Sequence, residues 1–197
     1  SLGALAERRF GAGRGVDELV HLNGGGSGIG GGVIARGELL TGAHGYAGEF
    51  GHGRPGVPDA DLVTAERTLE AEVGRARLLG ALGLADADEP ELRRAVLASA
   101  DPAVRAELAR QQRVLAAAIA DAVNVFAPEL VVLGGALSVV REWDADALDA
   151  LVTARALPIA REGAAIRSAA LGRDRLLIGA AELALARVLE DPGSVAG

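Results

Sequence analysis

The apolar run Leu130-Val-Val-Leu133, followed directly by Gly134-Gly135, most strongly constrains what this 197-residue chain can fold into. Four consecutive apolar residues without alternation are typical of a strand that is buried on both faces, as in a parallel sheet. The longest predicted helix comes before this run, from the Asp101-Pro102 cap to the residue before Pro128. Another helix is predicted after it, over 144–156. A strand between two helices indicates an α/β fold.

The first part of the chain has a different pattern, with short strands and glycine-rich turns. Residues 17–24 are predicted to form a strand, and residues 31–40 a hairpin that turns at Arg36-Gly37. The segment 42–58 is predicted to be a loop because it is rich in glycine and proline, and helical periodicity follows over 64–84. The remaining predicted elements are a short helix over 91–98, a strand over 165–170 and a helix over 174–190. A hairpin followed by helix–strand units predicts a mixed sheet.

Charge and composition exclude several classes of function. The chain has 27 acidic and 20 basic residues, a formal net charge of −7, and every basic residue is arginine. An acidic domain without a basic stripe is a poor surface for duplex nucleic acid, because nonspecific affinity depends on phosphate neutralisation. The absence of lysine excludes Schiff-base chemistry and a P-loop lysine. The absence of cysteine excludes disulfides, thiolate metal sites and a cysteine nucleophile.

The glycine-rich stretch from Gly24 to Gly32 is the first candidate binding segment. Backbone N–H groups of residues without Cβ atoms can turn toward one anion, and Ser27 adds a hydroxyl donor. Gly26, Gly28 and Gly31 have the spacing of a dinucleotide-binding loop, but a strand is predicted where that motif requires a helix. A flexible tight turn is the alternative interpretation.

The second candidate is the pair Glu49 and His52, three residues apart in a glycine-rich loop. A carboxylate and an imidazole together can accept and donate hydrogen bonds to sugar hydroxyls. The pair is incomplete as a metal site, since zinc needs three or four ligands and the chain has no thiolate. A solvated loop is the alternative for both residues.

Two further sets of polar residues are interpreted as structural from their local pattern. Glu66, Glu70 and Glu72 lie in the predicted helix 64–84, where acidic residues are typical of a solvated face. His21 lies between Val20 and Leu22 on a predicted strand, so it is interpreted as a structural histidine.

The order of these segments resembles the ROK family of repressors and sugar kinases. The matching residues are Gly-x-Gly-Ile-Gly-Gly-Gly over 26–32, Leu-Leu-x-Gly-Ala-x-Gly-x-Ala-Gly-Glu-x-Gly-His over 39–52, and Pro-Glu-x-Val-Val-Leu-Gly-Gly over 128–135. The resemblance implies an actin-like ATPase, ribonuclease-H-like sugar kinase fold, of which residues 1–197 would form the C-terminal part with a mixed sheet. Because a predicted helix already runs at Leu2 without a cap, we expect the chain to be part of a longer protein.

The resemblance also implies roles for three groups of residues. ATP phosphates would be held by Gly26, Ser27, Gly28 and Gly30. The adenosine side would be contacted by Gly134 and Gly135. A sugar would be bound by Glu49, His52 and Glu70.

The chain departs from the family pattern in two places. Zinc-binding members carry a cluster of cysteines after the histidine, whereas here residues 53–67 contain none, and Thr68 takes the place of the last cysteine. We therefore expect no zinc site. In the kinases a catalytic aspartate in an Asn-Asp pair precedes the helix that begins here at about Ser1, so no catalytic residue is assigned within this chain.

These observations favour a ROK-type transcriptional regulator, with this chain as the part that binds a sugar or sugar phosphate and forms a homodimer. DNA would be bound only through an upstream winged helix-turn-helix domain. The alternative is the C-terminal half of an ATP-dependent sugar kinase of the hexokinase or glucokinase kind, which would use ATP with Mg²⁺. No signal peptide and no apolar run of roughly 20 residues is present, so we expect a cytoplasmic protein that does not enter a membrane.

Overall fold

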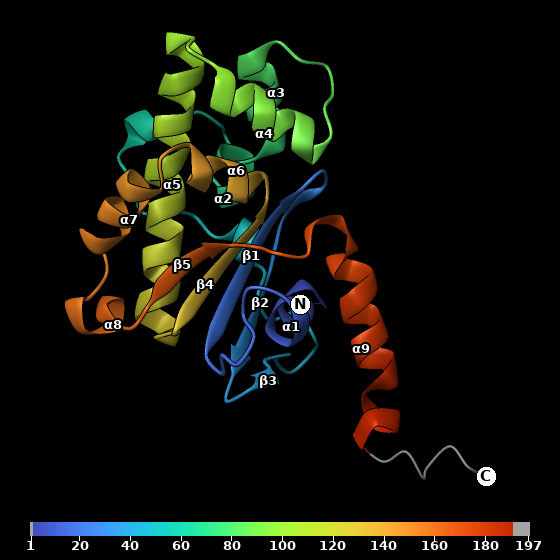
Figure 1. The fold of residues 1–197 in the computed structure, drawn as a ribbon. Coiled ribbons are helices and arrows are strands. Elements are labelled where there is room, and N and C mark those ends of the chain that lie inside the picture. Colours follow the sequence, from blue (N-terminus) through green and yellow to red (C-terminus); the bar gives the residue numbers. More distant parts are fainter. Residues whose placement is uncertain (1, 191–197) are drawn as a thin grey trace.

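The computed structural model describes residues 2–190, which form one five-stranded sheet with helices on both faces (Figure 1). The strand order is β3-β2-β1-β4-β5. The strands are β1 (Leu19–Gly25), β2 (Gly28–Ala35), β3 (Glu38–Leu39), β4 (Leu130–Gly135) and β5 (Ala165–Ser168). The pairs β1–β2 and β2–β3 are antiparallel, whereas the pairs β1–β4 and β4–β5 are parallel. The predicted α/β class and mixed sheet are confirmed.

The helices divide between the two faces of the sheet. Figure 1 shows α1 and α9 together beside one face, while α5, α6 and α7 cover the other. The helices are α1 (Leu2–Phe10), α2 (Leu69–Glu72), α3 (Arg75–Leu82), α4 (Glu89–Ala98), α5 (Pro102–Phe126), α6 (Ala136–Trp143), α7 (Ala145–Thr153), α8 (Pro158–Glu162) and α9 (Arg175–Glu190), with 3-10 turns η1 (Phe50–His52), η2 (Asp59–Asp61) and η3 (Gly172–Asp174). No helix in the described part of the chain is both long and apolar enough to span a membrane.

Alternation along the strands builds a core on each side of the sheet. On β1, Leu19 packs into the smaller core with Ala4 of α1, whereas Leu22 belongs to the larger core with Leu115 of α5. All six residues of β4 are buried, as expected for its uninterrupted apolar sequence. The central strands β1 and β4 are therefore fixed from both faces, and their ends provide a rigid base for loops.

The long helix α5 begins and ends as the sequence predicts. The Asp101 side chain accepts a hydrogen bond from the Ala103 N–H at 2.8 Å, and Pro102 occupies the first turn. At the other end Ala127 adopts a left-handed conformation (φ 45°) directly before Pro128.

The structure differs from the sequence-based prediction in several places, including helix α8, which was not predicted. The predicted helix over 64–84 is wrong as one element: its first residues are irregular, and α2 is separated from α3 by Gly74, whose φ of 139° no helix contains. Strand β2 begins at Gly28 rather than Gly31, because its glycines pair with β1. Helix α6 directly follows β4 and was not predicted.

Candidate functional site

The glycines predicted to bind a nucleotide come together where β1 and β4 end. Gly26 and Ser27 form the two-residue turn between β1 and β2, with Gly25 paired to Gly28. Because β1 and β4 are parallel, Gly24 lies directly beside Gly135. Ligands of open α/β sheets commonly bind at this carboxyl edge. Two segments about a hundred residues apart thus meet at one edge of the sheet.

Position 135 requires a glycine, because of its backbone conformation and the close approach of Gly24. Its φ is 59°, and a Cβ atom there would overlap the carbonyl oxygen of Gly24. A side chain at Gly134 would meet the Asn23 side chain at 2.6 Å. By contrast, the Cβ position of Gly26 opens into free space. The β4 glycines allow the two strands to approach, and Gly26 leaves room above the turn for a ligand.

A cavity of about 600 Å³ lies over this edge of the sheet. Its walls include Gly24, Gly25, Gly26, Gly135 and Ala136, together with residues of α3, α4 and the start of α9. Volumes of this order accommodate small-molecule ligands such as nucleotides. Ser27, Gly28, Gly30 and Gly134 do not line the cavity. Ser27 and Gly30 are exposed on the hairpin, Gly28 lies against Glu70, and Gly134 is buried within β4.

Three arginines, Arg75, Arg93 and Arg175, line the same cavity. Arg75 donates to the Ala87 carbonyl at 2.7 Å and forms an ion pair with Asp86, and Arg93 forms an ion pair with Glu142 at 3.0 Å. Guanidinium groups and backbone N–H groups both favour phosphate oxygens. The residues present therefore fit a phosphate-bearing ligand, with the glycine turn and the arginines on its walls.

Glu70, the only residue of the predicted sugar site on a helix, lies against the start of β2. Its Oε2 accepts a hydrogen bond from the Ile29 N–H at 3.2 Å. Gly28 has a φ of 128°, and a Cβ atom at that position would overlap the Glu70 carboxylate. A Cβ atom at Gly51 would lie 2.9 Å from the same oxygen. Two glycines thus allow the carboxylate to rest on backbone, which explains why Glu70 does not point freely into solvent.

His52 joins Glu70 at this position. Its Nδ1 lies 3.7 Å from Glu70 Oε1, and its side chain is 70% exposed while that of Glu70 is 30% exposed. The sequence pattern alone predicted neither this distance nor the role of Gly51, which packs η1 against β2. An exposed imidazole beside a half-buried carboxylate can accept and donate hydrogen bonds to one hydroxylated ligand.

Glu49 lies elsewhere. It precedes η1 and is exposed on a separate cavity of about 370 Å³, whose walls include Phe50, Asp121, Val125 and Phe126. Of the three residues predicted to bind a sugar, the structure brings His52 and Glu70 together. The assignment of Glu49 to the same site stays a prediction.

A third cavity, of about 280 Å³, lies between the 600 Å³ cavity and Glu70. Gly24, Gly25 and Gly26 line it as they line the larger cavity, and its other walls are formed by Gly28, Ile29, Glu70 and residues at the end of α2 and the start of α3. His52 is not among its lining residues. Arg75 also belongs to both cavities. The glycine turn is therefore a shared wall, with the arginine-lined space on one side and the Glu70 carboxylate on the other.

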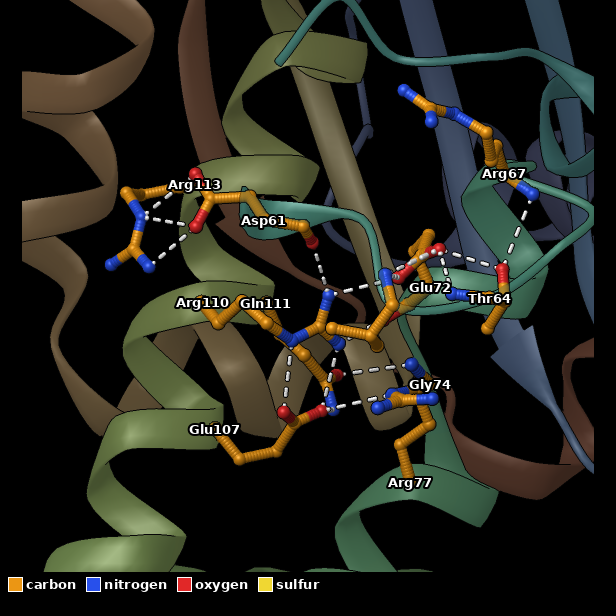
Figure 2. A network of polar contacts seen from close by, with 11 residues as sticks. Asp61, Thr64, Arg67, Glu72, Gly74, Arg77, Glu107, Arg110, Gln111 and Arg113 are labelled. Carbon is orange, nitrogen blue, oxygen red and sulfur yellow. Dashed lines mark hydrogen bonds and ion pairs between the residues drawn. The ribbon is translucent and has the colours of Figure 1, made fainter. Parts of the chain in front are cut away.

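The segment after His52 is held by ion pairs and hydrogen bonds that the sequence-based interpretation missed (Figure 2). Glu72 is fully buried, so its prediction as part of a solvated face is wrong. Burial opposes ionisation, but hydrogen bonds from Thr64 and Val63 and the charge of Arg110 keep the pKa of Glu72 below its usual value. Arg113 binds both oxygens of Asp61 and lowers the pKa of that carboxyl group.

One sequence signal could have indicated this network. The four polar residues 110–113 interrupt the apolar face of α5, and Arg110, Gln111 and Gln112 are all buried there. Buried polar side chains require partners.

Within residues 2–190, no group of three or more His, Cys, Asp or Glu residues is placed to hold a metal ion.

Comparison with known proteins decides the family. The model described as "ROK family" matches residues 1–187. This chain belongs to the ROK family. A glucokinase of Halalkalibacterium halodurans is 30% identical over 198 residues, covering 91% of this chain and 59% of that relative. The chain spans about half the length of the curated relatives it matches.

Solved ROK structures agree on the fold. A ROK family glucokinase from Streptomyces griseus, determined in complex with glucose and AMPPNP, is 26% identical with a TM-score of 0.68, covering 92% of this chain and 65% of that one. A ROK family transcriptional regulator, a homologue of the Escherichia coli MLC protein, has a TM-score of 0.72 at 24% identity, covering 91% and 48%. The sugar kinase fold predicted from the sequence is therefore confirmed, and both kinases and regulators share it.

Proposed function

We propose that this chain forms the part of an ATP-dependent sugar kinase that binds the sugar and the nucleotide. The observation that carries the proposal is the glycine segment 24–26, the end of β1 and the first residue of the turn, which lines both the arginine-lined cavity and the cavity at Glu70. Phosphoryl transfer requires the γ-phosphate and the accepting hydroxyl to be held close together and in line, and two adjoining cavities place a nucleotide and a sugar next to each other. The glucokinase relatives and the glucose-bound neighbour support a hexose as substrate.

Each side of the turn has a separate task in this proposal. The backbone N–H of Gly26 in the turn, with Arg75 beside it, binds phosphate oxygens. Bound ATP with Mg²⁺ supplies the phosphoryl group. Glu70 uses Oε2 for the Ile29 N–H, which leaves Oε1 and the neighbouring His52 ring for sugar hydroxyls. These residues bind and orient the two ligands. The family resemblance assigns the catalytic base to an aspartate that no residue of this chain matches.

The regulator interpretation is the second candidate, and one observation favours it. The segment after His52 lacks the cysteines of zinc-binding members and is held by the network of Glu72 and Arg110 instead. In this case a sugar or sugar phosphate at Glu70 and His52 would shift a conformational equilibrium of a homodimer. DNA would then be bound by a separate upstream domain.

Phosphoryl transfer from ATP to a panel of hexoses, measured with the full gene product, separates the two candidates. The kinase proposal predicts turnover with at least one hexose, and it predicts that Glu70→Gln reduces this turnover. Sugar binding by calorimetry without any turnover would contradict the kinase proposal and support the regulator. A matched control is Glu66→Gln, because Glu66 is an exposed residue near α2 that lines neither cavity.

A further inference from the structure

Helix α2 carries Glu70 but cannot hold its own position. It spans only Leu69–Glu72, a single turn, and its cap residue Thr68 makes no side-chain capping bond. Isolated helices of this length are unstable, because nucleation costs more than one turn of hydrogen bonds returns. The placement of Glu70 therefore depends on tertiary contacts at both ends of α2.

The contacts at the C-terminal end of α2 converge on the buried Glu72 carboxylate. It accepts hydrogen bonds from the Thr64 N–H at 2.8 Å, the Thr64 hydroxyl at 2.6 Å and the Val63 N–H at 3.0 Å. Arg110 Nη1 donates to Glu72 Oε2 at 3.0 Å. One side chain thus ties the irregular segment before α2 to the end of α2 and to helix α5 (Figure 2).

Arg110 extends the same connection along the backbone. It donates to the carbonyl oxygens of Asp61 at 2.7 Å and Glu72 at 2.5 Å. The Glu107 carboxylate accepts hydrogen bonds from Arg110 at 2.8 Å and from the side-chain amide of Gln111. The amide oxygen of Gln111 in turn accepts a hydrogen bond from the Gly74 N–H at 3.0 Å. Residues on both sides of Glu70 are therefore fixed to one face of α5. This helix is 25 residues long and is capped at its start.

We propose that Glu72 and Arg110 are positioning residues that hold the Glu70 carboxylate against the Ile29 N–H and beside His52. The inference deepens the proposed function, because Glu70 is its sugar-binding group. The Glu70–Ile29 hydrogen bond is already 3.2 Å long, so a shift of α2 by about an ångström breaks it. Neither Glu72 nor Arg110 lines the cavity at Glu70, so each acts only through the backbone of α2.

The test reads the Glu70–Ile29 hydrogen bond directly. The amide proton shift of Ile29 is measured by NMR in the wild type, in Glu70→Ala as the reference without an acceptor, and in Glu72→Gln. The expected result is that Glu72→Gln moves the Ile29 signal toward its Glu70→Ala position. Val152→Ala is the matched stability control, because Val152 is buried in α7, away from α2. An unchanged Ile29 signal in Glu72→Gln, or an equal movement in Val152→Ala, would overturn the proposal.

Glucose titrations provide the second readout through a double-mutant cycle. Glu72→Gln is expected to weaken glucose binding about tenfold in the wild-type background and less than about twofold in the Glu70→Ala background. Equal losses in both backgrounds would overturn the positioning role. If Glu72→Gln does not fold, Thr64→Val is put through the same measurements; it removes the 2.6 Å hydroxyl bond to Glu72 and the bond that the Thr64 hydroxyl accepts from the Arg67 N–H at 3.2 Å, and leaves the Glu72–Arg110 ion pair in place.

The two proposals fail separately. If the wild type binds no glucose and no other hexose while Glu72→Gln still moves the Ile29 signal, the proposed function is wrong and the positioning role stands. If the wild type binds glucose and the Ile29 signal does not move, the positioning role is wrong and the proposed function stands.

Discussion

Acid sensitivity of the fold should depend on His21. This residue lies on β1 against α1, is 2% exposed, and its Nε2 has no hydrogen-bond partner in the described part of the chain. A Cβ atom at Gly3 would lie 2.7 Å from the His21 ring, so α1 closes over it without space for water at that point. Burial lowers the pKa of His21 from 6.5 to about 3, with smaller contributions from nearby positive charges including Arg175.

The direction of the effect follows from proton binding. Between pH 6.5 and about 3 the unfolded chain protonates His21 and the folded chain does not, so the free energy of unfolding falls as pH falls through this window. Each pKa unit corresponds to about 1.4 kcal/mol. At pH 5 the loss attributable to His21 is therefore about 2 kcal/mol relative to pH 7.

Urea unfolding at pH 7 and pH 5 measures this loss. His21→Gln keeps a polar side chain that does not titrate. Between pH 7 and pH 5 the free energy of unfolding of this variant should therefore fall by about 2 kcal/mol less than that of the wild type. The comparison at pH 5 limits interference from Asp61 and Glu72, whose lowered pKa values place their titration at more acidic pH. The same pH dependence in both proteins would refute the claim that His21 is buried in its neutral form in the folded protein.

Three further predictions concern the two cavities and the network. The family resemblance implies that Glu49 also contacts the sugar, although it lies on a separate cavity; on that assignment Glu49→Ala weakens sugar binding at least about tenfold in calorimetry, and unchanged affinity would remove Glu49 from the site. Gly135→Ala should lower the melting temperature and weaken binding of an ATP analogue, because its Cβ would overlap Gly24; a variant as stable as the wild type would contradict this geometry. Arg110→Met should cost about 3–5 kcal/mol in urea unfolding, because it leaves Glu72 buried without its cation; a loss below about 1 kcal/mol would show that the pair contributes little.

Much of the sheet could be predicted because its signals are local. The apolar run 130–133 needs a buried strand in any context, and its flanking Gly134-Gly135 marks the strand end. The turn at Arg36-Gly37 was also predicted, and both residues have the positive φ angles of a two-residue hairpin, 53° and 77°. Strand β2 was predicted too short, since its first glycines have no side chains that indicate a strand.

The site depended on contacts between distant residues, which a local pattern cannot reveal. Glu70 and Ile29 are 41 residues apart, and Glu72 and Arg110 are 38 apart. Neighbouring acidic residues on a predicted helix therefore differ in environment, with Glu66 exposed and Glu72 buried. The resemblance to the ROK family supplied Glu70 as a candidate, whereas the structure alone supplied its hydrogen bond to β2.

The most direct test of the central claim compares ATP-dependent hexose phosphorylation by the wild type and by Glu70→Ala, using the full gene product of each. The account predicts that Glu70→Ala lowers kcat/KM for the hexose at least about a hundredfold, because the carboxylate on the sugar side of the glycine turn is lost. The KM for ATP should change little, since Glu70 does not line the arginine-lined cavity. Equal kcat/KM values for the two proteins, or no phosphoryl transfer to any hexose by the wild type, would contradict the account.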